Sequence, residues 1–153
     1  MKRPPNIFNH IPHAKALGFE LVSSEPNRCR LRVRYDDHLV GDPDTGVIHG
    51  GVITAALDNA SGFAVRLNKT VGEVSSMATL DLRIDYMRPA RPEQDLYVLA
   101  DCFRATSSIA FVRAHAYHED ESDPVATSTA AFMFTRGTSE PKPSEPTSET
   151  GQT

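Results

Sequence analysis

The sequence has little of several features that would place it in a specialised class of protein. Among its 153 residues there are only two cysteines, Cys29 and Cys102. Each stands in a strand-like alternating run, so we interpret both as core thiols and not as activated nucleophiles. No stretch approaches the about eighteen apolar residues of a membrane span, and no apolar core of a secretion signal follows the basic N-terminal residues. We therefore expect a soluble, cytoplasmic protein that does not enter a membrane.

A strong net charge is also missing. The formal net charge is −4 and the isoelectric point is near 5.8, which disfavours nucleic acid and anionic membranes as partners. Four arginines alternate through one run, at Arg28, Arg30, Arg32 and Arg34, but no aromatic residue is interleaved on their face. We interpret this run as the solvated face of a strand and not as a nucleic-acid-binding stripe.

Several chemical motifs are absent as well. Neither a Gly-x-Ser-x-Gly elbow nor a Walker phosphate loop occurs, which argues against the enzymes built on them. His115 and His118 would point to opposite faces of a strand, and no further ligand accompanies His10 and His13 on their expected helix. We therefore expect no metal and no prosthetic cofactor.

The length suits one ordinary domain with a single core. Residues 6–17 carry apolar side chains at helical spacing, and Gly18 would end this helix. We predict an N-terminal helical segment over residues 1–18 and a main domain over residues 19–136. Residues 137–153 contain no large apolar side chain, so burial cannot offset their ordering entropy and we expect a disordered tail.

The main domain combines one apolar helix with long alternating runs. Residues 52–67 are apolar around most of a helix and leave only Thr54, Asp58 and Ser61 as a narrow polar line, which is typical of a buried helix. Residues 36–47 have the composition of a loop. Runs with a period of two predict strands over residues 19–23, 28–35, 78–86, 96–103, 109–117 and 125–134. We therefore predict an α+β fold in which an antiparallel sheet wraps around one long central helix.

The start of this helix is where chemistry is expected. Gly50 and Gly51 directly precede the apolar run, so backbone N–H groups at the positive end of the helix dipole could approach an oxyanion closely. Asp58 follows two turns later on the polar line. Burying a carboxylate is costly unless it is paired or functional, so Asp58 is a candidate catalytic group. The alternative is a structural carboxylate that Ser61 or a partner subunit satisfies.

Two motifs together resemble the hotdog-fold thioesterases of the PaaI-like, phenylacetate-pathway type. The first is His49-Gly50-Gly51 with an aspartate nine residues after the histidine, and the second is the run Ala78-Thr-Leu-Asp-Leu-Arg-Ile-Asp-Tyr-Met-Arg-Pro-Ala90. The order of strands from residue 19 to residue 136 also matches, so the resemblance covers about three quarters of the chain.

The resemblance implies an acyl-CoA thioesterase that works as a homo-oligomer, a dimer or tetramer with sites at the subunit interface. Asp58 matches the acidic residue that activates water or attacks the thioester itself, and the Gly50 N–H matches the group that polarises the carbonyl from the other subunit. Thr79 matches a residue that holds the water, although an ordinary exposed strand threonine is the alternative. His49 would orient the loop or touch substrate, and the structural role is favoured.

The resemblance also indicates where substrate would lie. The loop before the glycines commonly carries an amide in the family, whereas this chain has Asp42 and Asp44 there. Phe63, Leu67 and Met77 would wall a pocket for an apolar or aromatic acyl group. Arg88 and Arg91 would meet the CoA phosphates or else be solvated. The candidate substrate-binding residues are Gly51, Asp42, Asn59, Phe63, Met77, Arg88 and Arg91.

Two other functions belong to the same fold. A hotdog module that binds acyl-CoA without hydrolysing it is the main alternative, because the amide of the Asp42 loop is missing. A dehydratase would be expected to carry a histidine on the central helix, and residues 52–67 contain none.

Overall fold

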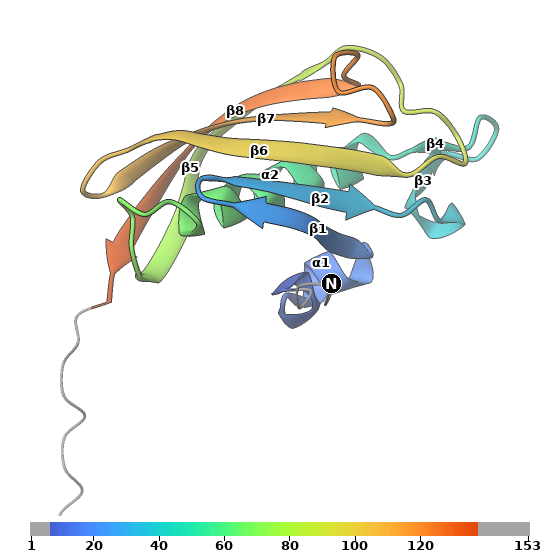
Figure 1. The fold of residues 1–153 in the computed structure, drawn as a ribbon. Coiled ribbons are helices and arrows are strands. Elements are labelled where there is room, and N and C mark those ends of the chain that lie inside the picture. Colours follow the sequence, from blue (N-terminus) through green and yellow to red (C-terminus); the bar gives the residue numbers. More distant parts are fainter. Residues whose placement is uncertain (1–6, 138–153) are drawn as a thin grey trace, which may run out of the picture.

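The computed structural model describes residues 7–137 of the chain. Six strands form one antiparallel sheet in the order β1-β2-β6-β7-β8-β5, and the long helix α2 packs against one of its faces (Figure 1). The predicted α+β hotdog architecture is confirmed. The elements are η1 (Ile7–His10), α1 (Pro12–Ala16), β1 (Phe19–Glu25), β2 (Arg28–Val33), η2 (Asp37–Leu39), β3 (Val40–Asp42), β4 (Val47–Ile48), α2 (Gly50–Arg66), β5 (Val74–Tyr86), β6 (Leu96–Ala105), β7 (Ile109–Tyr117) and β8 (Ala126–Arg136).

Helix α2 is the centre of the core. Its apolar side chains pack against β2, β6 and β7, and the alternate residues of these strands that face it are buried as well. Both cysteines lie in this core, as predicted, with Cys29 1% and Cys102 2% exposed. Burial raises the pKa of the Cys29 thiol to about 12. The buried positions on α2 are Val52, Ile53, Ala56, Leu57, Ala60, Ser61, Gly62, Ala64 and Val65.

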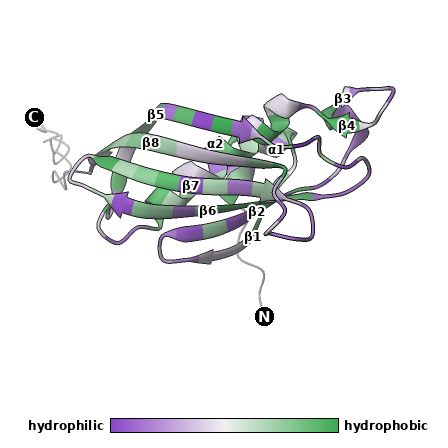
Figure 2. Cartoon of the chain, turned by 90° about the horizontal axis from the view of Figure 1, so that it is seen from above, coloured by the Kyte–Doolittle hydropathy of each residue, from purple (hydrophilic) through white to green (hydrophobic). Residues whose placement is uncertain are grey.

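Strand β5 forms one edge of the sheet and pairs only with β8 among the described residues. Hydrophilic and hydrophobic residues alternate along it (Figure 2), but the pairing register shifts between Thr79 and Asp81. At this bulge Leu80 is 54% exposed, whereas Leu82 beyond it packs on the core. A bulge adds one residue and reverses the phase of the alternation. Strict alternation along the predicted strand over residues 78–86 would place Thr79 and Leu82 on opposite faces. The bulge instead lets Thr79 contact Asp58 on α2 while Leu82 also packs on the core.

The other departures from prediction are local. The predicted N-terminal helix is divided at Pro12, because its ring cannot continue a helix begun before it. The two parts are the short 3-10 helix η1 and the short α-helix α1. Residues 36–47, expected as a loop, contain a second 3-10 helix, η2, and most of the small hairpin β3-β4. Helix α2 begins at Gly50, two residues earlier than the apolar run suggested. The predicted tail lies outside the described residues except for Gly137.

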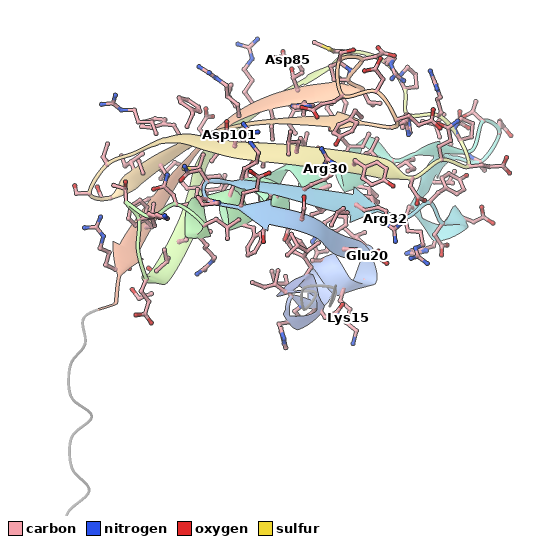
Figure 3. The ribbon with its side chains drawn as sticks, in the orientation of Figure 1. Lys15, Glu20, Arg30, Arg32, Asp85 and Asp101 are labelled. Carbon is pink, nitrogen blue, oxygen red and sulfur yellow. The ribbon has the colours of Figure 1, made fainter. Side chains whose placement is uncertain are left out.

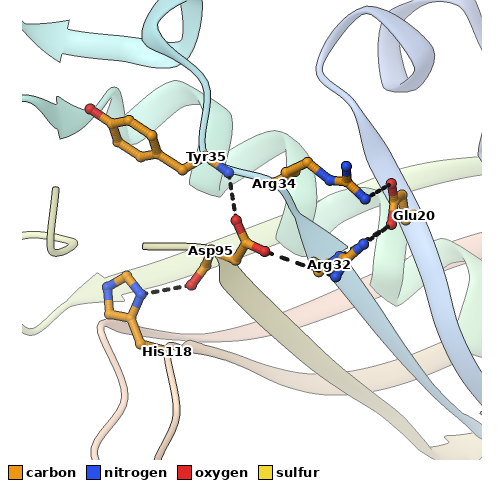
Figure 4. Close-up of polar contacts among 6 residues, drawn as sticks. All are labelled: Glu20, Arg32, Arg34, Tyr35, Asp95 and His118. Carbon is orange, nitrogen blue, oxygen red and sulfur yellow. Dashed lines mark hydrogen bonds and ion pairs between the residues drawn. The ribbon is translucent and has the colours of Figure 1, made fainter. Parts of the chain in front are cut away.

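The outer face of the sheet carries the predicted arginine run, and carboxylates neutralise it (Figure 3). Arg32 and Arg34 both pair with Glu20 on β1, the second at 3.1 Å (Figure 4). The hydrogen bond from Arg32 to Glu20 raises the pKa of the guanidinium further above its ordinary value. Arg28 pairs with Asp101 at 3.3 Å. The run is a paired, solvated strand face.

Candidate functional site

A cavity of about 250 Å³ lies beside α2, under strands β5 and β8. One face of α2 supplies a series of its lining residues at helical spacing, beginning with Asp58 and Asn59. Most of the remaining wall is apolar, so the cavity suits an acyl group. The lining residues are Ile7, Phe8, Ile11, Asp58, Asn59, Gly62, Phe63, Arg66, Met77, Thr79 and Phe132.

Asp58 and Thr79 meet at this cavity. The Thr79 hydroxyl donates a hydrogen bond of 2.8 Å to Asp58 Oδ1, which joins α2 to β5. Asp58 was expected to be buried, but it is partly exposed because the cavity admits solvent to it. Ser61 is not its partner: the Ser61 Oγ is buried without a hydrogen-bond partner among the described residues. The geometry leaves one carboxylate held by one hydroxyl beside an apolar space.

Three of the expected substrate-binding residues line the same cavity, namely Asn59, Phe63 and Met77. The Asn59 amide donates 2.8 Å to the Ala55 carbonyl within the helix, so this N–H is held by the backbone. Phe63 makes an edge-to-face contact with Phe8, with ring centroids 5.8 Å apart. Leu67, also expected in the wall, is not among the lining residues.

The start of α2 is built around His49. Its Nδ1 accepts a hydrogen bond of 2.8 Å from the Gly51 N–H and so caps the helix. A Cβ on Gly51 would lie 2.9 Å from that Nδ1, and one on Gly41 would lie 2.8 Å from the His49 Cα. Both glycines therefore make room for the histidine. The contact of His49 is structural, and the Gly51 N–H is occupied.

Unlike the Gly51 N–H, the Gly50 N–H has no hydrogen-bond acceptor within the described residues. As the first helical residue Gly50 has no partner in the intrahelical ladder, and within residues 7–137 its N–H finds no acceptor. Its carbonyl accepts a bond of 2.9 Å from the Tyr86 hydroxyl. Gly50, Tyr86 and Arg88 also line a second depression of about 370 Å³ at the helix start. A free backbone donor there is available to a ligand.

The remaining predicted residues lie away from the cavity beside Asp58. Asp42 closes a turn, accepting from the Asp44 N–H at 3.0 Å and from the Thr45 hydroxyl at 2.9 Å. The Arg88 guanidinium contacts Asp123 at 3.2 Å. The Arg91 backbone N–H donates a hydrogen bond of 2.8 Å to His118 Nε2. In this chain Asp42 acts as a turn residue.

Sequence reasoning did not find six of the eleven residues that line the cavity, namely Ile7, Phe8, Ile11, Gly62, Arg66 and Phe132. Ile7, Phe8 and Ile11 bring the N-terminal segment into the cavity wall, and no periodicity within that segment could show where it docks. Gly62 also lines the cavity, and its position four residues after Asp58 on a helix was a readable signal.

Within residues 7–137, no cluster of three or more histidine, cysteine, aspartate or glutamate residues is suited to hold a metal. In the same part of the chain, no helix has both the length and the apolar character that a membrane crossing requires.

Comparison with known proteins agrees with this geometry. A family model described as the thioesterase superfamily matches residues 45–125, which include Gly50, Asp58 and Thr79. The medium/long-chain acyl-CoA thioesterase YigI of Escherichia coli is 33% identical over 135 residues, covering 81% of this chain and 86% of YigI.

Solved structures show the same fold. A Pseudomonas aeruginosa protein is 36% identical with a TM-score of 0.73, covering 82% of this chain and 91% of its own. The Escherichia coli PaaI protein of the phenylacetic acid degradation operon has a TM-score of 0.74 at 17% identity, covering 86% of this chain and 90% of its own, a likeness of fold alone. The resemblance found in the sequence is confirmed, and the chain belongs to the thioesterase superfamily, with the hotdog fold of its PaaI-like members.

Proposed function

We propose that the protein is an acyl-CoA thioesterase, which hydrolyses an acyl-CoA thioester to free CoA and a carboxylic acid. The observation that carries this proposal is the Asp58 carboxylate, held at 2.8 Å by the Thr79 hydroxyl and open to an apolar cavity. Membership of the thioesterase superfamily and the acyl-CoA thioesterase activity named for the YigI relative support the same reaction.

In this mechanism Asp58 acts on the thioester carbonyl by one of two routes. As a general base it takes a proton from water while the water oxygen adds to the carbonyl carbon. As a nucleophile it adds directly and forms an anhydride that water then cleaves. In both routes the carbonyl becomes an oxyanion, which a backbone N–H can stabilise, and its collapse expels the CoA thiolate. Thr79 would fix the carboxylate, and a bound water with it.

The oxyanion donor and Asp58 of one site would come from two subunits. Gly50 and Asp58 are eight residues apart on one helix, which corresponds to about 12 Å along its axis. One carbonyl cannot contact both groups of the same chain at that separation. The depression beside Gly50 and the cavity beside Asp58 are therefore two half-sites, and a symmetric partner would bring one of each together.

The exposed edge of β5 is where such a partner would dock. This strand of 13 residues pairs on one side only within the described residues, and an open edge of that length is a template for another strand. Leu80 and Tyr86 on β5 are 54% and 51% exposed, and Met87 directly after the strand is 58% exposed. We propose a homodimer joined at β5, whose pairing into a tetramer is a separate question.

The proposed hydrolysis requires no prosthetic cofactor, and we propose none. Arg88 lines the depression that contains Gly50. Its guanidinium, now paired with Asp123, would bind a phosphate of CoA in place of that carboxylate. Arg91 is the second candidate for that contact. We propose a cytoplasmic location, where acyl-CoA is found, and neither a nucleic acid nor a membrane as a partner.

Steady-state release of CoA separates the enzyme from a binding module. Purified protein is given acyl-CoAs of short, medium and long chain length and an arylacetyl-CoA, while isothermal titration calorimetry measures binding of the same compounds. Turnover of at least one class supports the thioesterase. Binding without turnover would instead support a non-catalytic acyl-CoA-binding hotdog module. This is the alternative function, because the loop with Asp42 and Asp44 lacks the amide that is common in the family.

Mixed dimers test the shared site. Asp58→Asn and Gly50→Pro homodimers should each be nearly inactive, because each lacks one half of both sites. A statistical mixture would contain hybrids with one intact site, so about a quarter of wild-type activity should return. No recovery, despite mass-spectrometric detection of hybrids, would contradict the two-subunit site.

A further inference from the structure

Gly62 is a glycine in the interior of α2 with one side on the cavity. It stands four residues after Asp58, one turn further along the same helix face, and it lines the cavity beside Met77 and Phe132. Glycine is among the least favourable residues in a helix interior. Its φ angle is not positive, so the backbone conformation does not require it. What a glycine provides at this position is space at the cavity wall.

That space is narrow. A Cβ placed on Gly62 would lie 3.1 Å from the Met77 Cε and 3.5 Å from the Phe132 Cε1. The second distance is an ordinary van der Waals contact, and the first is short by a few tenths of an ångström. Met77 is a flexible, unbranched side chain and its terminal methyl can move. A side chain at position 62 can therefore be accommodated, but it and the displaced Met77 methyl take up volume at the cavity.

The part of the acyl site that this chain supplies is a cavity of about 250 Å³. A methyl group on its wall takes up about as much volume as one methylene of an acyl chain. One added methyl is therefore equivalent to about one carbon of the substrate.

We propose that Gly62 is a specificity-determining residue: its missing side chain, opposite Met77, sets the length of the acyl group that the cavity accepts. The acyl chain would extend from the thioester at Asp58 along α2, past Gly62, towards the N-terminal wall. This inference rests on the proposed function, because it assigns the cavity to the acyl portion of acyl-CoA.

The first test is a chain-length profile of kcat/KM from butyryl- to hexadecanoyl-CoA. Gly62→Ala should move the optimum to shorter chains and lower kcat/KM for the longest good substrate about tenfold, the effect of one methylene in an apolar pocket. Met77→Ala should move the optimum to longer chains, and the double variant should return towards wild type. The matched control is Ser61→Ala on the same helix, a buried position that does not line the cavity; its profile should be unchanged.

The second test reads binding alone. In an Asp58→Asn background, the affinity for each acyl-CoA is measured by calorimetry with and without Gly62→Ala. A shift in the preferred chain length supports the proposal even if the wild type hydrolyses nothing, in which case only the thioesterase function fails. Turnover with an unchanged profile, an equal loss at every length, or no acyl-dependent binding at all would each overturn the role of Gly62.

Discussion

Replacing Gly50 by proline would remove one N–H group at the start of α2 and little else. Proline is favoured at the first position of a helix, where the N–H has no intrahelical partner. The residue before a proline must be extended, and His49 already has φ −59° and ψ 133°. The atoms nearest to a Cβ at position 50 would be those of the Tyr86 ring and hydroxyl, at 3.7–3.8 Å, which is ordinary van der Waals contact. We therefore expect the Gly50→Pro protein to fold, with an unfolding free energy within about 1 kcal/mol of wild type.

Its activity should nevertheless fall sharply. Removing one oxyanion donor costs about 100- to 1,000-fold in kcat, equivalent to about 2.7–4 kcal/mol. Gly50→Ala is the matched control, because it adds the Cβ but keeps the N–H. We expect kcat of the proline variant to lie at least about tenfold below that of the alanine variant. Thermal melts confirm folding, and CoA release gives kcat. Equal activity of the two variants would refute the assignment of this N–H.

Three further predictions concern other groups. Thr79→Val should lower kcat about tenfold, because it removes the hydrogen bond to Asp58; this is the low end for a bond to a charged group, since the pair is partly exposed. Thr79→Ser keeps the hydroxyl and should keep most of the activity. Equal rates for the two variants would count against a role of this contact in catalysis. Cys29 should resist thiol reagents at about pH 8 until urea unfolds the protein, since burial raises its pKa to about 12, and fast native labelling would contradict this. The hydrogen bond between Asp36 and His38 raises the pKa of the histidine and lowers that of the aspartate. Its contribution to stability is therefore present between the two pKa values and is lost as pH rises through that of the histidine. In urea unfolding, Asp36→Asn should destabilise the protein more at about pH 5.5 than at about pH 8.5, and a larger effect at the higher pH would contradict this.

Much of the fold could be predicted because two periodicities in this sequence are strong. The apolar helix from Gly50 and the alternating strands after it are both buried when the sheet curves around the helix, which is the arrangement found. The core positions of Cys29 and Cys102 followed from the same alternation, since in a strand every second residue faces one side.

The face of Thr79 could not be read in the same way. Strict alternation assigned it to the side opposite Leu82, and the bulge at Leu80 reversed that assignment. A bulge depends on how β5 fits both β8 and α2, so a pattern within one strand carries little sign of it. The contact between Thr79 and Asp58 is therefore a tertiary result, and only the family resemblance had indicated that Thr79 belongs to the site.

Asp42 and the N-terminal wall show the other limit of the sequence. An aspartate in a loop is compatible with either a binding site or a turn, and here its contacts with Asp44 and Thr45 are those of a turn. The docking of Ile7 and Phe8 on the cavity depends on contacts with distant parts of the chain. Local patterns do not contain that information.

The role of Asp58 is tested most directly by the rate of CoA release by the Asp58→Asn protein beside wild type, on the acyl-CoA that wild type hydrolyses best. Asparagine keeps the size of the side chain and can still accept the Thr79 hydrogen bond, but it can neither take a proton from water nor attack the thioester. We expect a loss of kcat of at least about a hundredfold with the melting temperature and acyl-CoA affinity retained. Activity within a few-fold of wild type would contradict a catalytic role of Asp58.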